Sequence, residues 1–159
     1  MISGATISDQ GSSTGLSVTG VLSVTANPSL STVTLSSNNN TFGGLLTSAG
    51  NVTIYNKGNL VLLPGSNDLT AFITATGNIS TSGVGGSIYT TLSLVSGGNV
   101  TITNDTKFLA GGALLITAPG VVNLSALSNI IDFNNGSIVP YINGLPAAVA
   151  TPTYLPPSP

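Results

Sequence analysis

Six side chains in this chain of 159 residues carry a charge at neutral pH, and they limit the chemistry available to it. They are two lysines and four aspartates, Lys57, Lys107, Asp9, Asp68, Asp105 and Asp132. Histidine, cysteine, arginine, glutamate and tryptophan are absent. Zinc and haem sites built on His or Cys are therefore excluded, and so are Ser-His-Asp and Cys-His catalysis. Two lysines cannot form the basic surface that nucleic acids require, and neither completes a phosphate-binding loop.

The aspartates offer one further kind of chemistry, because glycoside hydrolysis uses a pair of carboxylates at a defined separation. Asp105 and Asp132 could form such a pair if coils of about 21–27 residues bring them onto nearby coils. Asp105, however, lies in Asn104-Asp-Thr-Lys107, which is typical of a turn. Calcium-loop motifs are also missing. We therefore predict no enzymatic activity, no catalytic residues, no cofactor and no metal site, with a polysaccharide-active enzyme as a minor alternative.

The elements that would position any site are short β-strands. Apolar residues never recur with helical spacing, whereas alternation of Val, Leu or Ile with Ser or Thr occurs throughout. Clear examples are Leu22–Thr25, Val33–Leu35, Val52–Ile54, Leu92–Leu94, Val100–Ile102 and Val122–Leu124. No apolar stretch approaches the roughly 20 residues of a membrane-spanning helix. The chain is therefore predicted to be all-β, with no membrane span.

A repeat organises these strands. Gly50-Asn-Val-Thr-Ile54 recurs as Gly77-Asn-Ile-Ser-Thr81 and Gly98-Asn-Val-Thr-Ile102, with a degenerate copy at Gly120–Leu124. The intervals of 27, 21 and 22 residues predict a parallel β-solenoid with coils of roughly 21 residues. The longer interval predicts a loop outside one corner around Pro64–Asp68. An antiparallel β-sandwich with many short strands is the alternative.

Asparagine has two predicted roles. Asn51, Asn78 and Asn99 occupy equivalent repeat positions, so we expect them to stack as a structural ladder at one corner of the coils. Seven asparagines also begin an Asn-x-Ser/Thr sequence and are candidates for glycosylation. They are Asn39, Asn51, Asn78, Asn99, Asn104, Asn123 and Asn135.

Three organisational regions follow. Residues 1–45 repeat less clearly and are predicted to be an N-terminal cap or irregular coils, and residues 46–133 form the repeat solenoid. Residues 134–159 are proline-rich and are predicted to be an extended arm or linker. Tyr154 and Leu155 are its candidate anchors on a neighbouring subunit. Thr-x-Thr pairs at Thr32/Thr34, Thr74/Thr76 and Thr101/Thr103 raise ice binding as a further minor alternative.

The units Gly98-Asn-Val-Thr-Ile-Thr103 and Leu109–Gly120 resemble the haemagglutinin-type repeats of bacterial filamentous adhesins, the exoproteins of two-partner secretion, and of autotransporter passengers. The resemblance spans about Gly50 to Leu124. It implies a right-handed parallel β-helix and an extracellular or cell-surface structural protein acting in adhesion or as a fibre. Exposed strand edges or a terminal arm would join copies of the chain to one another, and a host or matrix glycan is a further possible partner. The alternative from the sandwich fold is a glycosylated filament subunit linked by donor-strand exchange.

Overall fold

The computed structural model describes residues 6–9, 13–27, 31–82, 86–103, 105–124, 130–132, 140–146 and 153–154. All regular elements within these residues are β-strands. The strands are β1 (Thr6–Ser8), β2 (Ser17–Thr25), β3 (Thr32–Leu35), β4 (Thr41–Asn56), β5 (Leu60–Leu62), β6 (Asn67–Ala75), β7 (Ile79–Thr81), β8 (Gly86–Ser96), β9 (Val100–Thr101), β10 (Asp105–Thr117), β11 (Val122–Asn123), β12 (Ile130–Asp132), β13 (Tyr141–Ile142), β14 (Leu145–Pro146) and β15 (Thr153–Tyr154). None of the described residues forms a helix long and apolar enough to cross a membrane.

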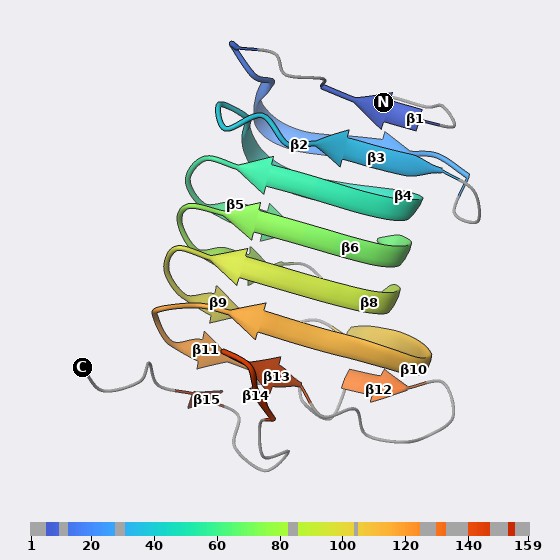
Figure 1. Cartoon of the computed structure of the whole chain (residues 1–159), viewed down its shortest axis with the longest axis vertical. Coiled ribbons are helices and arrows are strands. Elements are labelled where there is room, and N and C mark those ends of the chain that lie inside the picture. The colour runs from blue at the N-terminus through green and yellow to red at the C-terminus, as the bar shows by residue number, and fades with distance from the viewer. Residues whose placement is uncertain are drawn as a thin grey trace.

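The strands stack as the coils of a parallel β-solenoid of about four turns (Figure 1). Strands β4, β6, β8 and β10 pair in parallel with one another, and β5, β7, β9 and β11 form a second parallel series behind them. The antiparallel pairs within the described residues lie at the C-terminal end, where β14 joins β13 and β15 joins β11. The predicted solenoid is therefore confirmed, and the antiparallel sandwich is wrong.

Register divides each coil into three faces, which are named here by their residues. The front face comprises residues 32–35, 51–56, 70–75, 91–96, 113–117 and 141–142. The back face comprises residues 41–45, 60–62, 79–81, 100–101 and 122–123. The side face comprises residues 24–25, 47–49, 67–68, 87–89, 106–108 and 130–132. Strands β1 to β3 belong to the same stack, so the N-terminal region forms coils that continue into the repeat.

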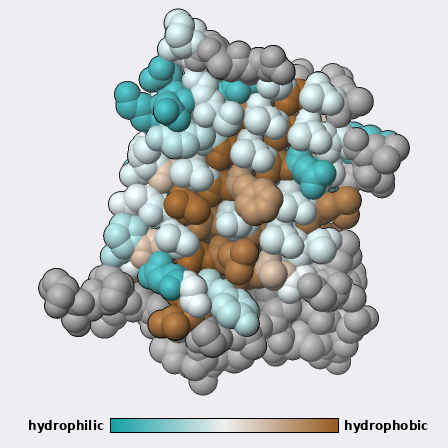
Figure 2. Space-filling model, viewed as in Figure 1, coloured by the Kyte–Doolittle hydropathy of each residue, from teal (hydrophilic) through white to brown (hydrophobic). Residues whose placement is uncertain are grey.

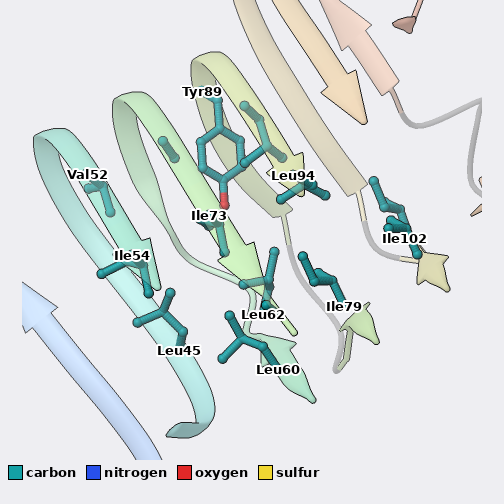
Figure 3. Packing of buried hydrophobic residues seen from close by; sticks show 14 of the residues in the cluster. Leu45, Val52, Ile54, Leu60, Leu62, Ile73, Ile79, Tyr89, Leu94 and Ile102 are labelled. Atoms are coloured by element: carbon teal, nitrogen blue, oxygen red, sulfur yellow. The ribbon is translucent and has the colours of Figure 1, made fainter. Parts of the chain in front are cut away.

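Alternation along the strands fills the interior with apolar columns (Figure 3). One column on the front face contains Leu35, Ile54, Ile73, Leu94 and Ile116, each paired with the next across one strand spacing. Each of these side chains is at most 2% exposed. Burial of such a side chain contributes about 1.5–3 kcal/mol, so the columns supply the main stabilisation of the stack.

The alignment of the repeats in the structure differs from the predicted alignment in the first repeat. Gly77 and Gly98 precede the back face, and their structural equivalent in the preceding coil is Gly58 rather than Gly50. Gly50 lies within β4, where the sequence turns into the front face. The hydrogen-bonded corners are consequently 19, 21 and 22 residues apart, and the 27-residue interval is not a coil length.

The predicted external loop at Pro64–Asp68 is therefore wrong. Pro64 and Gly65 make a tight turn, which Gly65 permits through its positive φ of 96°. Asn67 and Asp68 follow at once in β6 and pair with both neighbouring coils. The segment is a corner of the coil, and it carries the Asp68 side chain into the interior, where 2% of it is exposed.

Candidate functional site

The outward side chains of the front face form a regular array of three columns. Each column runs across the strands in register, so its members share one position of successive coils. The first column contains Thr32, Asn51, Thr70, Thr91 and Ala113, the middle column Thr34, Thr53, Phe72, Ser93, Leu115 and Tyr141, and the third column Tyr55, Thr74, Val95 and Thr117. Neighbouring members of a column are about 4.8 Å apart, and neighbouring columns are about 7 Å apart.

This array combines hydroxyls with exposed apolar side chains and carries no charge. Phe72 is 49% exposed, Tyr141 45%, Val95 41% and Leu115 38%. Figure 2, which looks onto this face, shows such apolar side chains among the pale hydroxyl residues. Lys57 is the lysine that lies nearest in sequence to a residue of the array, and it lies outside the array, just beyond the end of β4. The front face is therefore a surface for neutral contacts.

A ladder of asparagines holds the corner between the front and back faces. The backbone N–H of Asn78 donates to Asn59 Oδ1 at 2.8 Å, and that of Asn99 donates to Asn78 Oδ1 at 2.7 Å. The backbone N–H of Val121 completes the series with Asn99 Oδ1 at 2.8 Å. The structure thus brings together two of the three predicted ladder residues. The third, Asn51, lies in the first column of the front face, and Asn59 occupies the expected place.

The ladder asparagines are exposed on the outside of the corner, and buried polar side chains pair with the backbone beneath them. Asn56 is buried, accepts a hydrogen bond from the N–H of Phe42 at 2.6 Å and donates to the carbonyl of Asn59 at 2.9 Å. Two coils further on, the hydroxyl of Ser96 donates to the carbonyl of Gly77 at 2.8 Å. These bonds give partners to backbone groups of the corner, which a stable buried turn requires.

The ladder also explains the glycines at positions 77, 98 and 120, each of which lies beside a ladder asparagine of the preceding coil. A Cβ at Gly98 would overlap Asn78 Oδ1, and a Cβ at Gly120 would overlap Asn99 Oδ1. A Cβ at Gly77 would overlap Asn59 Oδ1 in the same way. The Gly-Asn pair is therefore one device, in which the asparagine of one coil uses the space left by the glycine of the next.

The side face contains a buried carboxylate. Asp68 Oδ2 accepts a hydrogen bond from the hydroxyl of Thr47 at 2.6 Å, and Oδ1 accepts one from the backbone N–H of Ala49 at 2.9 Å. Burial raises the pKa of Asp68 from its ordinary 3.8 to about 6, although both hydrogen bonds act in the opposite direction. Tyr89 is the in-register neighbour of Asp68 in the next coil and is 3% exposed.

Tyr89 is the second titratable group of this interior cluster. Burial and the negative charge of Asp68 raise the pKa of Tyr89 to about 12, while hydrogen bonds from Ser66 and Ser87 lower it. A small, partly open cavity of about 10 Å³ adjoins the ring, among Leu62, Ser87 and Leu92. That volume is near the lower limit for one water molecule. The cluster is closed to any larger ligand.

The other aspartates are distributed along the stack. Asp9 lies near the N-terminal end, where its carboxylate accepts hydrogen bonds from the N–H groups of Ser36 and Ser37 and from Asn40 Nδ2. Burial raises the pKa of Asp9, but these hydrogen bonds outweigh it and hold the pKa below its ordinary value. Asp105 begins β10, and register places Asp132 beside Phe108. Their side chains lie outside the described part of the structure.

The glycosylation candidates fall mostly on the surface. Asn39, Asn51, Asn78 and Asn99 are exposed, and Asn123 in β11 is half-buried. Asn104 and Asn135 lie outside the described residues. Their modification stays a prediction.

The predicted assembly arm pairs with its own chain. Tyr154 lies in β15, which runs antiparallel to β11, with Tyr154 opposite Val122 and Thr153 opposite Asn123. Leu155 lies outside the described residues. Within the described residues, β15 thus lies beside β11 at the C-terminal end of the back face (Figure 1).

Sequence reasoning missed Asn59 and the buried position of Asp68. The first had a usable signal, because Gly58-Asn59-Leu60 has the same Gly-Asn-apolar pattern as Gly77-Asn78-Ile79. The second had a weaker one, since Ser66 and Asp68 alternate with outward residues in the manner of an inward strand edge. Comparison with protein-family models, curated proteins and solved structures gave no significant match to this chain.

Proposed function

We propose that this chain is a structural and adhesive segment of an extracellular or cell-surface protein and that it acts by contact through its front face. The observation that carries this proposal is the uncharged array of hydroxyl and apolar side chains that register fixes on that face. Its mechanism is non-covalent, and the segment is not an enzyme. The composition agrees with this role, because only 4% of the residues are charged and the solvent-facing positions are mainly Ser, Thr and Asn.

Rigidity supports an adhesive role. The outward side chains stand on strands whose inward neighbours are almost fully buried, such as Ile73 beside Phe72 and Thr74. A preorganised surface of this kind loses little conformational entropy when it meets a partner. Many weak contacts repeated along the stack then add up, as in other multivalent interactions.

Self-association through strand edges remains part of the proposal. At the C-terminal end, β15 pairs with β11 and β14 pairs with β13. Copies of the chain would therefore join there by exchange, in which β15 leaves its own β11 and pairs with β11 of a neighbour. This route needs no new contact surface, because the exchanged pair is the one the single chain already makes.

Placing a charge on the front face tests the adhesive role. We expect Thr53→Asp, in the middle column, to weaken adsorption to uncharged surfaces about tenfold, because the carboxylate loses hydration wherever the face makes contact. The measurement is an adsorption isotherm on neutral, hydroxyl-terminated monolayers by quartz microbalance.

The matched control is Ser80→Asp, which introduces the same charge at an outward position of β7 on the back face. It should adsorb like the unchanged protein. Equal losses for Thr53→Asp and Ser80→Asp would contradict the proposal, because binding would then depend on net charge and not on the front face. Thermal unfolding of both variants checks that the coils are intact.

Ice binding is a second candidate function, favoured by the threonines of the same face. Thr70 and Thr91 are in-register neighbours in the first column, and Thr74 stands in the third column on the same strand as Thr70. The predicted Thr-x-Thr pairs are divided between faces, since Thr32 and Thr34 lie on the front face and Thr101 lies on the back face. Thermal hysteresis and ice shaping by the purified protein would support this candidate, and their absence would remove it.

A further inference from the structure

We infer that the front face binds a flat, neutral polysaccharide, whose sugar rings stack on the middle column and whose hydroxyls meet the threonines beside it. This inference rests on the proposed adhesive function and names the partner of the same face. The observations that carry it are the placement of aromatic and apolar side chains, the flanking hydroxyls and the absence of charge.

The middle column supplies the stacking surface. Phe72, Leu115 and Tyr141 project from it, and the pairing Phe72–Ser93–Leu115–Tyr141 spans three strand spacings, or roughly 14 Å. All three are between 38% and 49% exposed, so their apolar surfaces are accessible without rearrangement. Aromatic rings present a flat apolar face, which suits the C–H faces of pyranose rings. A straight polymer lying along the column would meet these side chains in turn.

The adjacent columns supply hydrogen-bonding groups on both sides. Thr70 and Thr91 lie in the first column, and Thr74 and Thr117 lie in the third. A hydroxyl both donates and accepts, so a row of threonines can match sugar hydroxyls in either orientation. Apolar side chains interspersed with hydroxyls can meet both parts of a sugar polymer, whose ring faces are apolar and whose edges are polar.

The lack of charge selects a neutral polymer. The outward residues of the three columns include no Asp, Glu, Lys, Arg or His, and the whole chain has a net charge of −2. Sulfated or uronic-acid polymers would find no counter-charge here and would be repelled weakly by the chain. A second copy of the chain fits less well, because hydroxyls separate the apolar side chains, whereas homodimer interfaces are about 65% apolar.

The test is a set of binding isotherms on insoluble neutral polysaccharides, using microcrystalline cellulose and chitin, with carboxymethyl-cellulose beads as the charged comparison. We expect saturable binding of the full chain to at least one neutral polymer and at least tenfold weaker binding to the charged one. Phe72→Ala should weaken binding to the neutral polymer about tenfold or more, and Phe72→Tyr should retain it.

Leu69→Ala is the matched control, because Leu69 is a 40% exposed apolar side chain at the corner, outside the three columns. It should bind like the unchanged protein. Equal losses in Phe72→Ala and Leu69→Ala, equal binding to the charged beads, or no saturable binding to either neutral polymer would each overturn the inference. If neutral monolayers still bind the protein and Thr53→Asp weakens that binding about tenfold, the adhesive function stands while the polysaccharide inference fails. If the protein binds neither the neutral monolayers nor the neutral polysaccharides, both the adhesive function and the polysaccharide inference are contradicted.

Discussion

Replacing Gly98 with alanine should lower the free energy of unfolding by about 2 kcal/mol. The added Cβ would overlap Asn78 Oδ1, the atom that accepts the hydrogen bond from the N–H of Asn99. The asparagine side chain has to move, so the corner loses that bond and its close packing. The backbone φ of Gly98 is not in the positive region, so the expected loss is steric and does not come from strain in the dihedral angles. Urea unfolding followed by circular dichroism measures it.

A double-mutant cycle separates this cause from a general intolerance of alanine. Asn78→Ala alone should cost about 1 kcal/mol, and Gly98→Ala should then add little, because the nearest remaining neighbour is Asn78 N at an ordinary 3.5 Å. Gly77→Ala behaves differently, since its Cβ would also lie 2.8 Å from the backbone carbon of Gly58. Its cost should persist when Asn59 is changed to alanine. Additive losses at Gly98 and Asn78 would show that the pair is not one device.

Stability should fall as the pH rises from about 4 to about 6, because Asp68 is harder to ionise in the folded chain than in the unfolded one. Burial raises its pKa from 3.8 to about 6, so in this window the folded state binds more protons than the unfolded state. The contribution is fully present below about pH 4 and is lost as the pH passes 6, by on the order of 3 kcal/mol. Asp9 acts with the opposite sign and at lower pH, because its pKa is held below 3.8. Urea unfolding at intervals between pH 4 and pH 7 measures the slope.

Two substitutions identify Asp68 as the source of this slope. Asp68→Asn should flatten the profile and match or exceed the stability of the unchanged protein at pH 7, because its amide can donate to Thr47 Oγ1 while Oδ1 keeps the N–H of Ala49. Asp68→Ala should also flatten the profile, but it leaves both groups buried without a partner, so it should cost about 2–4 kcal/mol at pH 4, where Asp68 is protonated, and clearly less at pH 7. A slope that survives Asp68→Asn would assign the pH dependence to another group.

The sequence predicts the fold well, because alternation and the Gly-Asn repeat have direct physical causes. Inward Leu, Ile and Val recur at one coil position, as in Ile54, Ile73 and Leu94, and together they stabilise a stack of coils. The low content of charged residues likewise predicts that the surface consists mainly of Ser, Thr and Asn, as the exposed positions do. These features act locally, so they are visible without knowledge of which strands pair.

The register between strands could not be predicted from the sequence. Gly50-Asn51-Val52 and Gly98-Asn99-Val100 have the same local pattern, yet Asn51 faces outward from β4 while Asn99 holds a corner. Alternation specifies which side chains point inward but not which face of the coil a strand occupies. The same ambiguity hides the front-face array, because the pairing of Phe72 with Thr53 and Ser93 appears only when the coils are aligned.

The direction of the hydrogen bonds determines how the segment carries mechanical load. The bonds that join coils, including those from Asn78 to Asn59 and from Asn99 to Asn78, connect neighbours along the stack. A pull that separates the two ends of the stack therefore opens one coil at a time, since each coil contacts only its neighbours. Every coil of 19 to 22 residues that opens releases up to about 70 Å of chain. An anchored segment of this design would lengthen in steps under tension and keep its remaining coils, and with them most of its contact surface, in place.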